Sequence, residues 1–377
     1  QNEKPPFLPT REGFDENFGI PYSDDMTRTA TAPDLPLMRG GKVIEAPAGR
    51  DLLAKRCTEE AVSFIDRHAD RPFFLYLPHP MPGSTAAPFS SPAFRGRSRN
   101  GPYGDSVEEL DWATGEILGA LERRGLASNT LVVWTSDNGA VRRNPPQGSC
   151  APYQGYGYDT SEGSMRVPCL VRWPGRVPAG RVCDELCTTM DLLPTLAALA
   201  GAAPPPRPID GHDIRPLLLG EAGARSPWDD TGFGFYRMEQ LQAVRAGPWK
   251  LYLPLAAKYV SLGRKTAPAK AGLYDVARDA AETREVSAEH PDVVKRLEGL
   301  ADRLRAEIGD MDRPGRGERP AGFAAHPQPL LLKPQEGPRR EAPWPHAAAT
   351  PEDRATHTRE TQAWVYHSRI LPGGGGR

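Results

Sequence analysis

Two oxygen-bearing side chains, Asp137 and Asn138, come directly after the apolar, β-branched run at residues 130–135. Such a run is typical of a buried strand, and ligands usually bind where the strands of an α/β sheet end. Carboxylate and amide oxygens are the donors that Ca²⁺ and Mg²⁺ prefer. An Asp-Asn-Gly sequence is also common where a strand ends in a simple turn. The residues alone therefore leave a metal site and a plain turn both open.

A second candidate is His79, which follows the aromatic and apolar run at residues 73–77 and lies between two prolines. A histidine at the end of a strand can act as a general acid or as a metal ligand, but it can also be an ordinary loop residue. Three arginines, Arg142, Arg143 and Arg166, could pair with an anionic substrate or could simply be solvated surface charges. These positions remain alternatives at the level of the sequence.

The elements that must position these side chains alternate between helices and strands. Ser106 and Glu109 match a capping box, which predicts that a helix begins there. Helical spacing of apolar residues recurs in four segments, and continuous apolar runs predict three strands, of which the first two are expected to be buried. The helices are expected at 52–65, 107–121, 192–199 and 294–308, and the strands at 72–78, 130–135 and 167–173. This alternation is typical of an α/β layered sheet.

Three regions of the chain differ in composition. Residues 1–225 predict the α/β domain, whose first 50 or so residues are expected to be surface loops. Residues 226–311 predict a smaller antiparallel sheet followed by one helix. Residues 312–377 are predicted to be a disordered tail, because they combine many prolines with a terminal glycine run and few residues to bury.

The overall composition argues against two classes of function. The chain of 377 residues has 47 Lys and Arg against 48 Asp and Glu, and this formal net charge of −1 argues against a dedicated nucleic-acid binder. No apolar run approaches the roughly 18 residues needed to span a membrane. The five cysteines form no Cys-x-x-Cys pair, and an odd number cannot all pair with one another.

A series of short motifs resembles the type I, formylglycine-dependent sulfatases, in particular the branch of arylsulfatase A and N-acetylgalactosamine-6-sulfatase. Each motif is weak alone, but together they follow the family's order over residues 8–309. They are the segments 13–23 (GFDENFGIPYS), 72–79 (PFFLYLPH), 135–139 (TSDNG), 162–168 (EGSMRVP), 173–175 (WPG), 191–197 (DLLPTLA), 210–213 (DGHD) and 273–275 (LYD).

The resemblance implies an alkaline-phosphatase-like α/β fold, with an incomplete large mixed sheet and a smaller C-terminal sheet. It also implies hydrolysis of sulfate esters, with Asp137 and Asn138 supplying two ligands to a Ca²⁺ that holds the sulfate. The partner would be a sulfated small molecule or polysaccharide, and the location would be secreted, periplasmic or lysosomal by analogy with the family.

Several family features are absent from the sequence. No cysteine begins the Cys-x-Pro-x-Arg motif whose cysteine becomes formylglycine, so the nucleophile is expected upstream, in a missing N-terminal portion. Gly83 stands where the family has a histidine that donates to the sulfate, and Gly157 stands where it has a lysine. His79 is the expected substitute for the lost histidine. The losses favour an alternative, a catalytically inactive sulfatase-like protein that keeps the fold and binds sulfated ligands.

Overall fold

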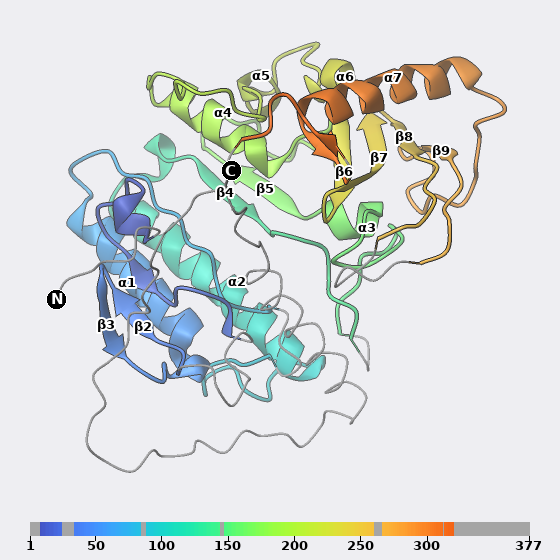
Figure 1. The fold of residues 1–377 in the computed structure, drawn as a ribbon. Coiled ribbons are helices and arrows are strands. Elements are labelled where there is room, and N and C mark those ends of the chain that lie inside the picture. Colours follow the sequence, from blue (N-terminus) through green and yellow to red (C-terminus); the bar gives the residue numbers. More distant parts are fainter. Residues whose placement is uncertain are drawn as a thin grey trace, which may run out of the picture. The chain divides into compact units, whose positions relative to one another are not determined.

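A computed structural model describes residues 8–24, 34–83, 88–143, 147–259, 266–311 and 313–319. The chain divides into two compact units (Figure 1). Unit 1 contains residues 1–127 and 143–147, and unit 2 contains residues 128–142 and 148–320; the remaining residues, 321–377, lie outside the described part. The predicted boundaries near 225 and 312 were drawn on composition, and they stay predictions.

Unit 1 combines a small antiparallel sheet with two helices that pack against each other (Figure 1). The apolar core lies where Leu37, Leu53, Met81 and Phe89 meet. The expectation of surface loops over the first 50 residues is therefore wrong. The sequence did not reveal these strands, because strands this short show no alternation of apolar and polar residues. The elements are η1 Pro9–Arg11, β1 Phe18–Gly19, β2 Leu37–Arg39, β3 Lys42–Glu45, η3 Arg50–Leu52, α1 Leu53–Arg67 and α2 Gly101–Arg123.

The predicted start of the second helix is also wrong. Helix α2 begins at Gly101, with a proline in its first turn, where a missing N–H costs nothing. Ser106 therefore lies inside the helix, and its hydroxyl donates to the Tyr103 carbonyl oxygen at 2.8 Å. Glu109 instead accepts a hydrogen bond from the Ser91 backbone N–H at 2.9 Å. The two residues form no capping box, although both are buried.

The segment at 72–78 was predicted to be a buried strand, and the structure contradicts this. Its backbone pairs with no strand in the described part of the chain. Phe74 is 61% exposed and Tyr76 is 65% exposed, while the alternate residues are half-buried. An apolar sequence favours an extended backbone, but burial of a strand needs neighbours on both of its faces.

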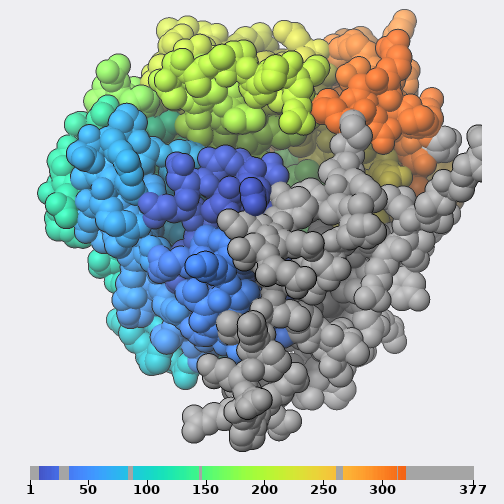
Figure 2. Space-filling view, turned by 60° about the vertical axis from the view of Figure 1, so that its left-hand side comes forward, coloured from blue at the N-terminus to red at the C-terminus, as the bar shows by residue number. Residues whose placement is uncertain are grey.

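Unit 2 begins with strand β4 Val132–Thr135, which pairs antiparallel with β5 Cys169–Arg172. The two strands are thus confirmed in position, but the burial predicted for β4 is wrong: no residue of β4 or β5 is buried, Trp134 is 39% exposed and Leu170 is 66% exposed. Helix α4 follows a capping box formed by Thr188 and Asp191. It carries an exposed leucine, Leu193. The surface near residue 200 is visible in yellow-green in Figure 2. The short elements are η4 Ala127–Asn129 (at the boundary of the units), α3 Glu162–Met165, η5 Thr189–Asp191, α4 Leu192–Leu199, α5 Arg215–Leu219 and α6 Trp228–Thr231.

A four-stranded antiparallel meander completes unit 2, in the order β6-β7-β8-β9. A small antiparallel sheet was expected here, but its fourth strand, β9, was not. Helix α7 packs on β7 and β8 (Figure 1), and Leu241, Leu251, Leu297 and Leu300 meet in the core between them. The strands are β6 Phe233–Arg237, β7 Gln240–Ala246, β8 Trp249–Tyr252 and β9 Gly272–Asp275, and the helix is α7 Pro291–Glu307.

A short hairpin follows the last helix. Strand β10 Gly309–Asp310 pairs with β11 Arg313–Pro314, so the predicted boundary at residue 311 falls inside this hairpin. Most of the predicted disordered tail, residues 320–377, lies outside the described residues. Among the helices that the structure describes, none is long and apolar enough to cross a membrane.

Candidate functional site

The Asp137–Asn138 pair forms a tight turn at the end of β4. The Asn138 backbone N–H donates to Asp137 Oδ1 at 2.8 Å, and the Asn138 side-chain Nδ2 donates to the Gly139 carbonyl oxygen at 2.9 Å. Ser136 Oγ donates to the Asn138 carbonyl oxygen at 3.2 Å. Asp137 is exposed, whereas Asn138 is half-buried and Gly139 is buried. The turn is therefore fixed by its own hydrogen bonds and presents its carboxylate outward.

Backbone contacts hold this turn against the segment 154–165. The Gly139 N–H donates to the Ser164 carbonyl oxygen at 2.8 Å, and the Gly157 N–H donates to the Ala140 carbonyl oxygen at 2.9 Å. The backbones approach so closely that a Cβ atom on Gly139 would lie 1.8 Å from the Gly163 oxygen. Only glycine permits such an approach, so these glycines set the position of the turn.

The donor chemistry of the turn fits a hard cation. Asp137 Oδ2 and Asn138 Oδ1 accept no hydrogen bond from any described residue, so both oxygens remain available as ligands. A Ca²⁺ ion takes six to eight oxygen ligands, of which this pair could supply two. The described residues contain no group of three or more His, Cys, Asp or Glu that could hold a metal ion. The pair by itself is therefore not a complete metal site, and any further ligands would come from water or from elsewhere in the protein.

His79 belongs to unit 1, whereas Asp137 and Asn138 belong to unit 2, and each is described within its own unit. Burial lowers the pKa of His79 to about 4, so the imidazole is neutral at neutral pH. Its Nδ1 atom is buried and has no hydrogen-bond partner among the described residues. A neutral imidazole is a poor proton donor to a leaving group but a good ligand or acceptor.

Gly83 and Gly157, where the resemblance implies a histidine and a lysine in the family, lie where a side chain does not fit. Gly83 has a φ of +50°, and a Cβ atom there would lie 2.9 Å from the Pro80 carbonyl oxygen. The Gly83 carbonyl oxygen accepts a hydrogen bond from the Arg143 guanidinium at 2.5 Å. A Cβ atom on Gly157 would lie 2.7 Å from the Gly139 oxygen and 3.4 Å from Asn138 Nδ2. The backbone at both positions is therefore adapted to glycine.

The remaining candidate arginines lie over aromatic rings. The Arg142 guanidinium lies 5.4 Å from the centre of the Tyr156 ring, and the Arg166 guanidinium lies 4.6 Å from the centre of the Tyr153 ring. Cation–π contacts of this kind contribute about 0.5–1 kcal/mol at exposed sites. These contacts give both arginines a packing role.

All five cysteines are described, and all are free thiols. Cys57 is buried, and burial raises its pKa to about 11, so its thiol is protonated at neutral pH. Cys169, Cys183 and Cys187 are exposed, and Cys150 is half-buried. A protonated thiol is a weak nucleophile, which agrees with the absence of the Cys-x-Pro-x-Arg motif from the sequence.

A buried ionic network in unit 2 was not predicted from the sequence. Glu162 Oε2 accepts from Arg245 Nη1 at 2.6 Å, and Glu162 Oε1 lies 3.2 Å from Lys250 Nζ. Lys250 Nζ also lies 3.2 Å from Glu282 Oε1. All four side chains are almost completely buried. The available signal was a lysine in the middle of an apolar predicted strand, where a cation needs a buried partner.

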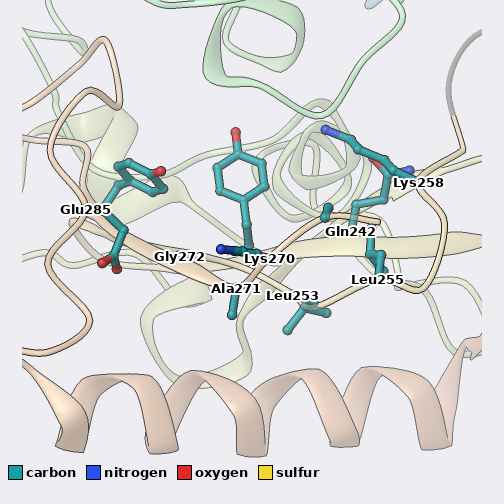
Figure 3. A pocket seen from close by; sticks show the side chains of 11 residues that line it. Gln242, Leu253, Leu255, Lys258, Lys270, Ala271, Gly272 and Glu285 are labelled. Carbon is teal, nitrogen blue, oxygen red and sulfur yellow. The ribbon is translucent and has the colours of Figure 1, made fainter. Parts of the chain in front are cut away.

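A separate cavity of about 390 Å³ opens beside β8 and β9 (Figure 3). Lys258, Lys270 and Glu285 lie on its lining with Tyr252 and Tyr274. Its lining therefore mixes both signs of charge, and it includes neither Asp137 nor Asn138.

The fold is that of the alkaline-phosphatase-like α/β proteins, as solved relatives show. A sulfatase from Pseudoalteromonas sp., PsFucS1, superimposes with a TM-score of 0.66 over 79% of this chain and 68% of its own, at 23% identity. A Bacteroides thetaiotaomicron protein, solved in work on the metabolism of multiple glycosaminoglycans, gives a TM-score of 0.59 at 28% identity, over 71% of this chain and 57% of its own.

The chain belongs to the sulfatase family, because the family model described as Sulfatase matches residues 2–202. A second model, N-sulphoglucosamine sulphohydrolase, C-terminal, matches residues 158–308. Steryl-sulfatase of Mus musculus is 38% identical over 329 residues, which cover 79% of this chain and 50% of that protein. N-acetylgalactosamine-6-sulfatase of Canis lupus familiaris is 38% identical over 268 residues, which cover 66% of this chain and 49% of that protein. The chain thus spans about half the length of these relatives.

Proposed function

We propose that this chain is part of a sulfuric ester hydrolase in which Asp137 and Asn138 bind Ca²⁺. The single observation that carries the proposal is the turn after β4, which leaves one oxygen on each side chain free of hydrogen-bond donors in the described part of the chain. Membership of the sulfatase family supports the same assignment.

In the proposed chemistry the bound Ca²⁺ supplies positive charge for a sulfate group. Asp137 and Asn138 hold that charge in place, because the Gly139 and Gly157 backbone contacts fix their turn. The nucleophile is none of the five cysteines present, since none begins a Cys-x-Pro-x-Arg motif. The formylglycine expected for the family would therefore lie elsewhere in the protein.

The substrate class is a sulfate monoester on a small molecule or a sugar. The solved structures similar to this chain include one in complex with its substrate D-glucosamine-2-N,6-O-disulfate and one from work on the metabolism of multiple glycosaminoglycans. The names of the curated relatives include a steryl-sulfatase and an N-acetylgalactosamine-6-sulfatase. Sterol and sugar esters share the sulfate group, and the proposal is limited to that shared chemistry.

A second candidate function is binding of a sulfated ligand without turnover. Gly83 and Gly157 favour it, because a Cβ atom at either position would lie under 3.0 Å from a backbone oxygen. The proton donor and the cation expected from the family are absent at these two positions. The close backbone oxygens also leave no room for a single substitution to restore a side chain there. Loss of one such transition-state donor costs about 10²–10³ in rate in other enzymes.

Hydrolysis of 4-nitrophenyl sulfate by the complete protein that contains this sequence separates the two candidates. The hydrolase proposal expects Ca²⁺-dependent release of 4-nitrophenolate that is lost in Asp137→Ala and retained in Asp184→Ala. Asp184 is a matched control, because it is exposed and belongs to the same unit. Binding of the ester with no release of 4-nitrophenolate would instead support the second candidate.

A further inference from the structure

The buried network of unit 2 joins two parts of the chain that are far apart in sequence. Lys250 is fully buried on β8, between the carboxylates of Glu162 on α3 and Glu282 after β9. Its ammonium group lies 4.1 Å from the centre of the Phe235 ring. Two cations, Arg245 and Lys250, balance two carboxylates, so no charge is left without a partner of opposite sign.

We propose that Arg245, Lys250 and Glu282 are positioning residues for the Asp137–Asn138 pair, and that they act through α3. The inference rests on the proposed function for its meaning, because the pair matters only if it binds a metal. The structural part of the proposal does not depend on a metal. It states that the C-terminal sheet fixes the segment 154–165, and that this segment fixes the turn after β4.

The first step runs from the sheet to the segment. Lys250 Nζ donates to the Thr160 carbonyl oxygen at 2.9 Å, and Thr160 Oγ1 donates to Gln242 Oε1 at 2.9 Å. Glu282 Oε2 accepts from Gln154 Nε2 at 3.1 Å and from the Glu162 backbone N–H at 3.3 Å. The sheet therefore contacts the segment at its start, its middle and its helix.

The second step runs from the segment to the turn. The Ser164 carbonyl oxygen accepts from the Gly139 N–H at 2.8 Å, while Ser164 Oγ accepts from the Asp159 N–H at 3.1 Å. The Gly157 N–H reaches the Ala140 carbonyl oxygen at 2.9 Å. Two backbone hydrogen bonds thus tie the turn to the same short segment.

The composition of the segment explains why it needs ionic partners. Residues 160–164 are all buried, yet they are Thr, Ser, Glu, Gly and Ser. Such residues contribute little apolar surface, so their order depends on having their polar groups satisfied. Helix α3 has four residues and cannot be stable by itself. Buried ion pairs are often no better than apolar residues for stability, but they can specify one arrangement.

The test compares Lys250→Met with Lys295→Met by hydrogen–deuterium exchange and by Tb³⁺ luminescence. Lys295 is exposed on α7 in the same unit, so its substitution removes a charge without touching the network. Lys250→Met is expected to raise the exchange rate of peptides covering 136–141 at least about tenfold, because a lost buried ionic hydrogen bond costs about 1.5–3 kcal/mol. Peptides from α7 should keep their rates, and Tb³⁺ affinity should fall by a similar factor.

Unchanged exchange of the turn peptides in a folded Lys250→Met protein would overturn the proposal. If α7 also exchanges fast, the variant has unfolded, and Tyr252→Phe then decides. This change removes only the hydroxyl that donates to Glu282 Oε1 at 2.8 Å, and it should loosen the turn severalfold with α7 intact. No effect of Tyr252→Phe on the turn would overturn the proposal. Failure of the unsubstituted protein to bind Tb³⁺ would contradict the proposed function alone, because exchange does not require a metal.

Discussion

The turn after β4 and the segment that carries His79 follow similar apolar runs, but the structure holds them differently. The run before Asp137 pairs with β5, and its turn makes backbone hydrogen bonds to a neighbouring segment. The run before His79 pairs with no described strand and exposes Phe74 and Tyr76. Apolar composition therefore indicates an extended backbone, whereas burial depends on partners that the run itself does not specify.

The largest expected difference in stability is between a buried and an exposed apolar residue. Leu251 in the core of unit 2 is 1% exposed, while Phe74 is 61% exposed. Leu251→Ala should lower the free energy of unfolding of unit 2 by about 2–5 kcal/mol, because it removes buried methyl groups and leaves a cavity. Phe74→Ala should change stability by less than about 0.5 kcal/mol.

Urea unfolding followed by tryptophan fluorescence measures both changes. A cost for Phe74→Ala close to that for Leu251→Ala would mean that the 72–78 segment is buried in solution, and the contrast between the two regions would fail.

The next largest effect is the pH dependence that His79 confers on unit 1. Its folded-state pKa of about 4 lies below the usual value near 6.5, so between these values only the unfolded chain takes up the proton. The stabilisation is therefore complete above pH 6.5 and is lost as the pH falls to 4, by up to about 3 kcal/mol.

Urea midpoints at pH 7 and pH 4.5 for the unsubstituted protein and for His79→Gln should show this difference. The variant should lose less stability on acidification, since glutamine does not titrate. An identical loss in both proteins would show that His79 is already solvated.

The smallest expected effect on stability comes from a substitution at Gly139, where two backbone segments approach closely at the turn. Gly139→Ala places a methyl group against the Gly163 oxygen and should cost about 1–3 kcal/mol through overpacking. Gly299→Ala on α7 is the matched control, because a Cβ atom there meets nothing within 4 Å. It should stabilise the helix by about 0.5–1 kcal/mol.

Thermal unfolding measures both glycine variants. Equal effects of the same sign would show that the turn has room for a side chain and is not fixed by its contacts with the 154–165 segment.

Local pattern was enough to predict much of the fold. The helices near 52–65 and 294–308 and the C-terminal meander are confirmed, because apolar residues recur there with the period of the element. The capping box at Ser106 was wrong, since Gly101 and its following proline begin the helix earlier. The failure at 72–78 had a different cause, because the partners of a strand are not encoded in the strand.

The candidate site was predictable only in part. Asp137 and Asn138 stood out because they end an apolar run and match a family motif, and the proposal that they bind Ca²⁺ still rests on their chemistry. The ionic partners of Glu162 were not predictable, since Arg245 and Lys250 lie more than 80 residues away in sequence and meet it only in the fold. Sequence spacing carries no information about such contacts.

Competition between Tb³⁺ and Ca²⁺ measures whether the Asp137–Asn138 pair binds a metal ion. We expect Tb³⁺ emission that Ca²⁺ displaces, with affinity weakened at least about tenfold in Asp137→Ala and Asn138→Ala, since each removes a charged or polar ligand. Asp184→Ala should bind as the unsubstituted protein does. Equal affinity in Asp137→Ala and in the unsubstituted protein would contradict metal binding by the pair.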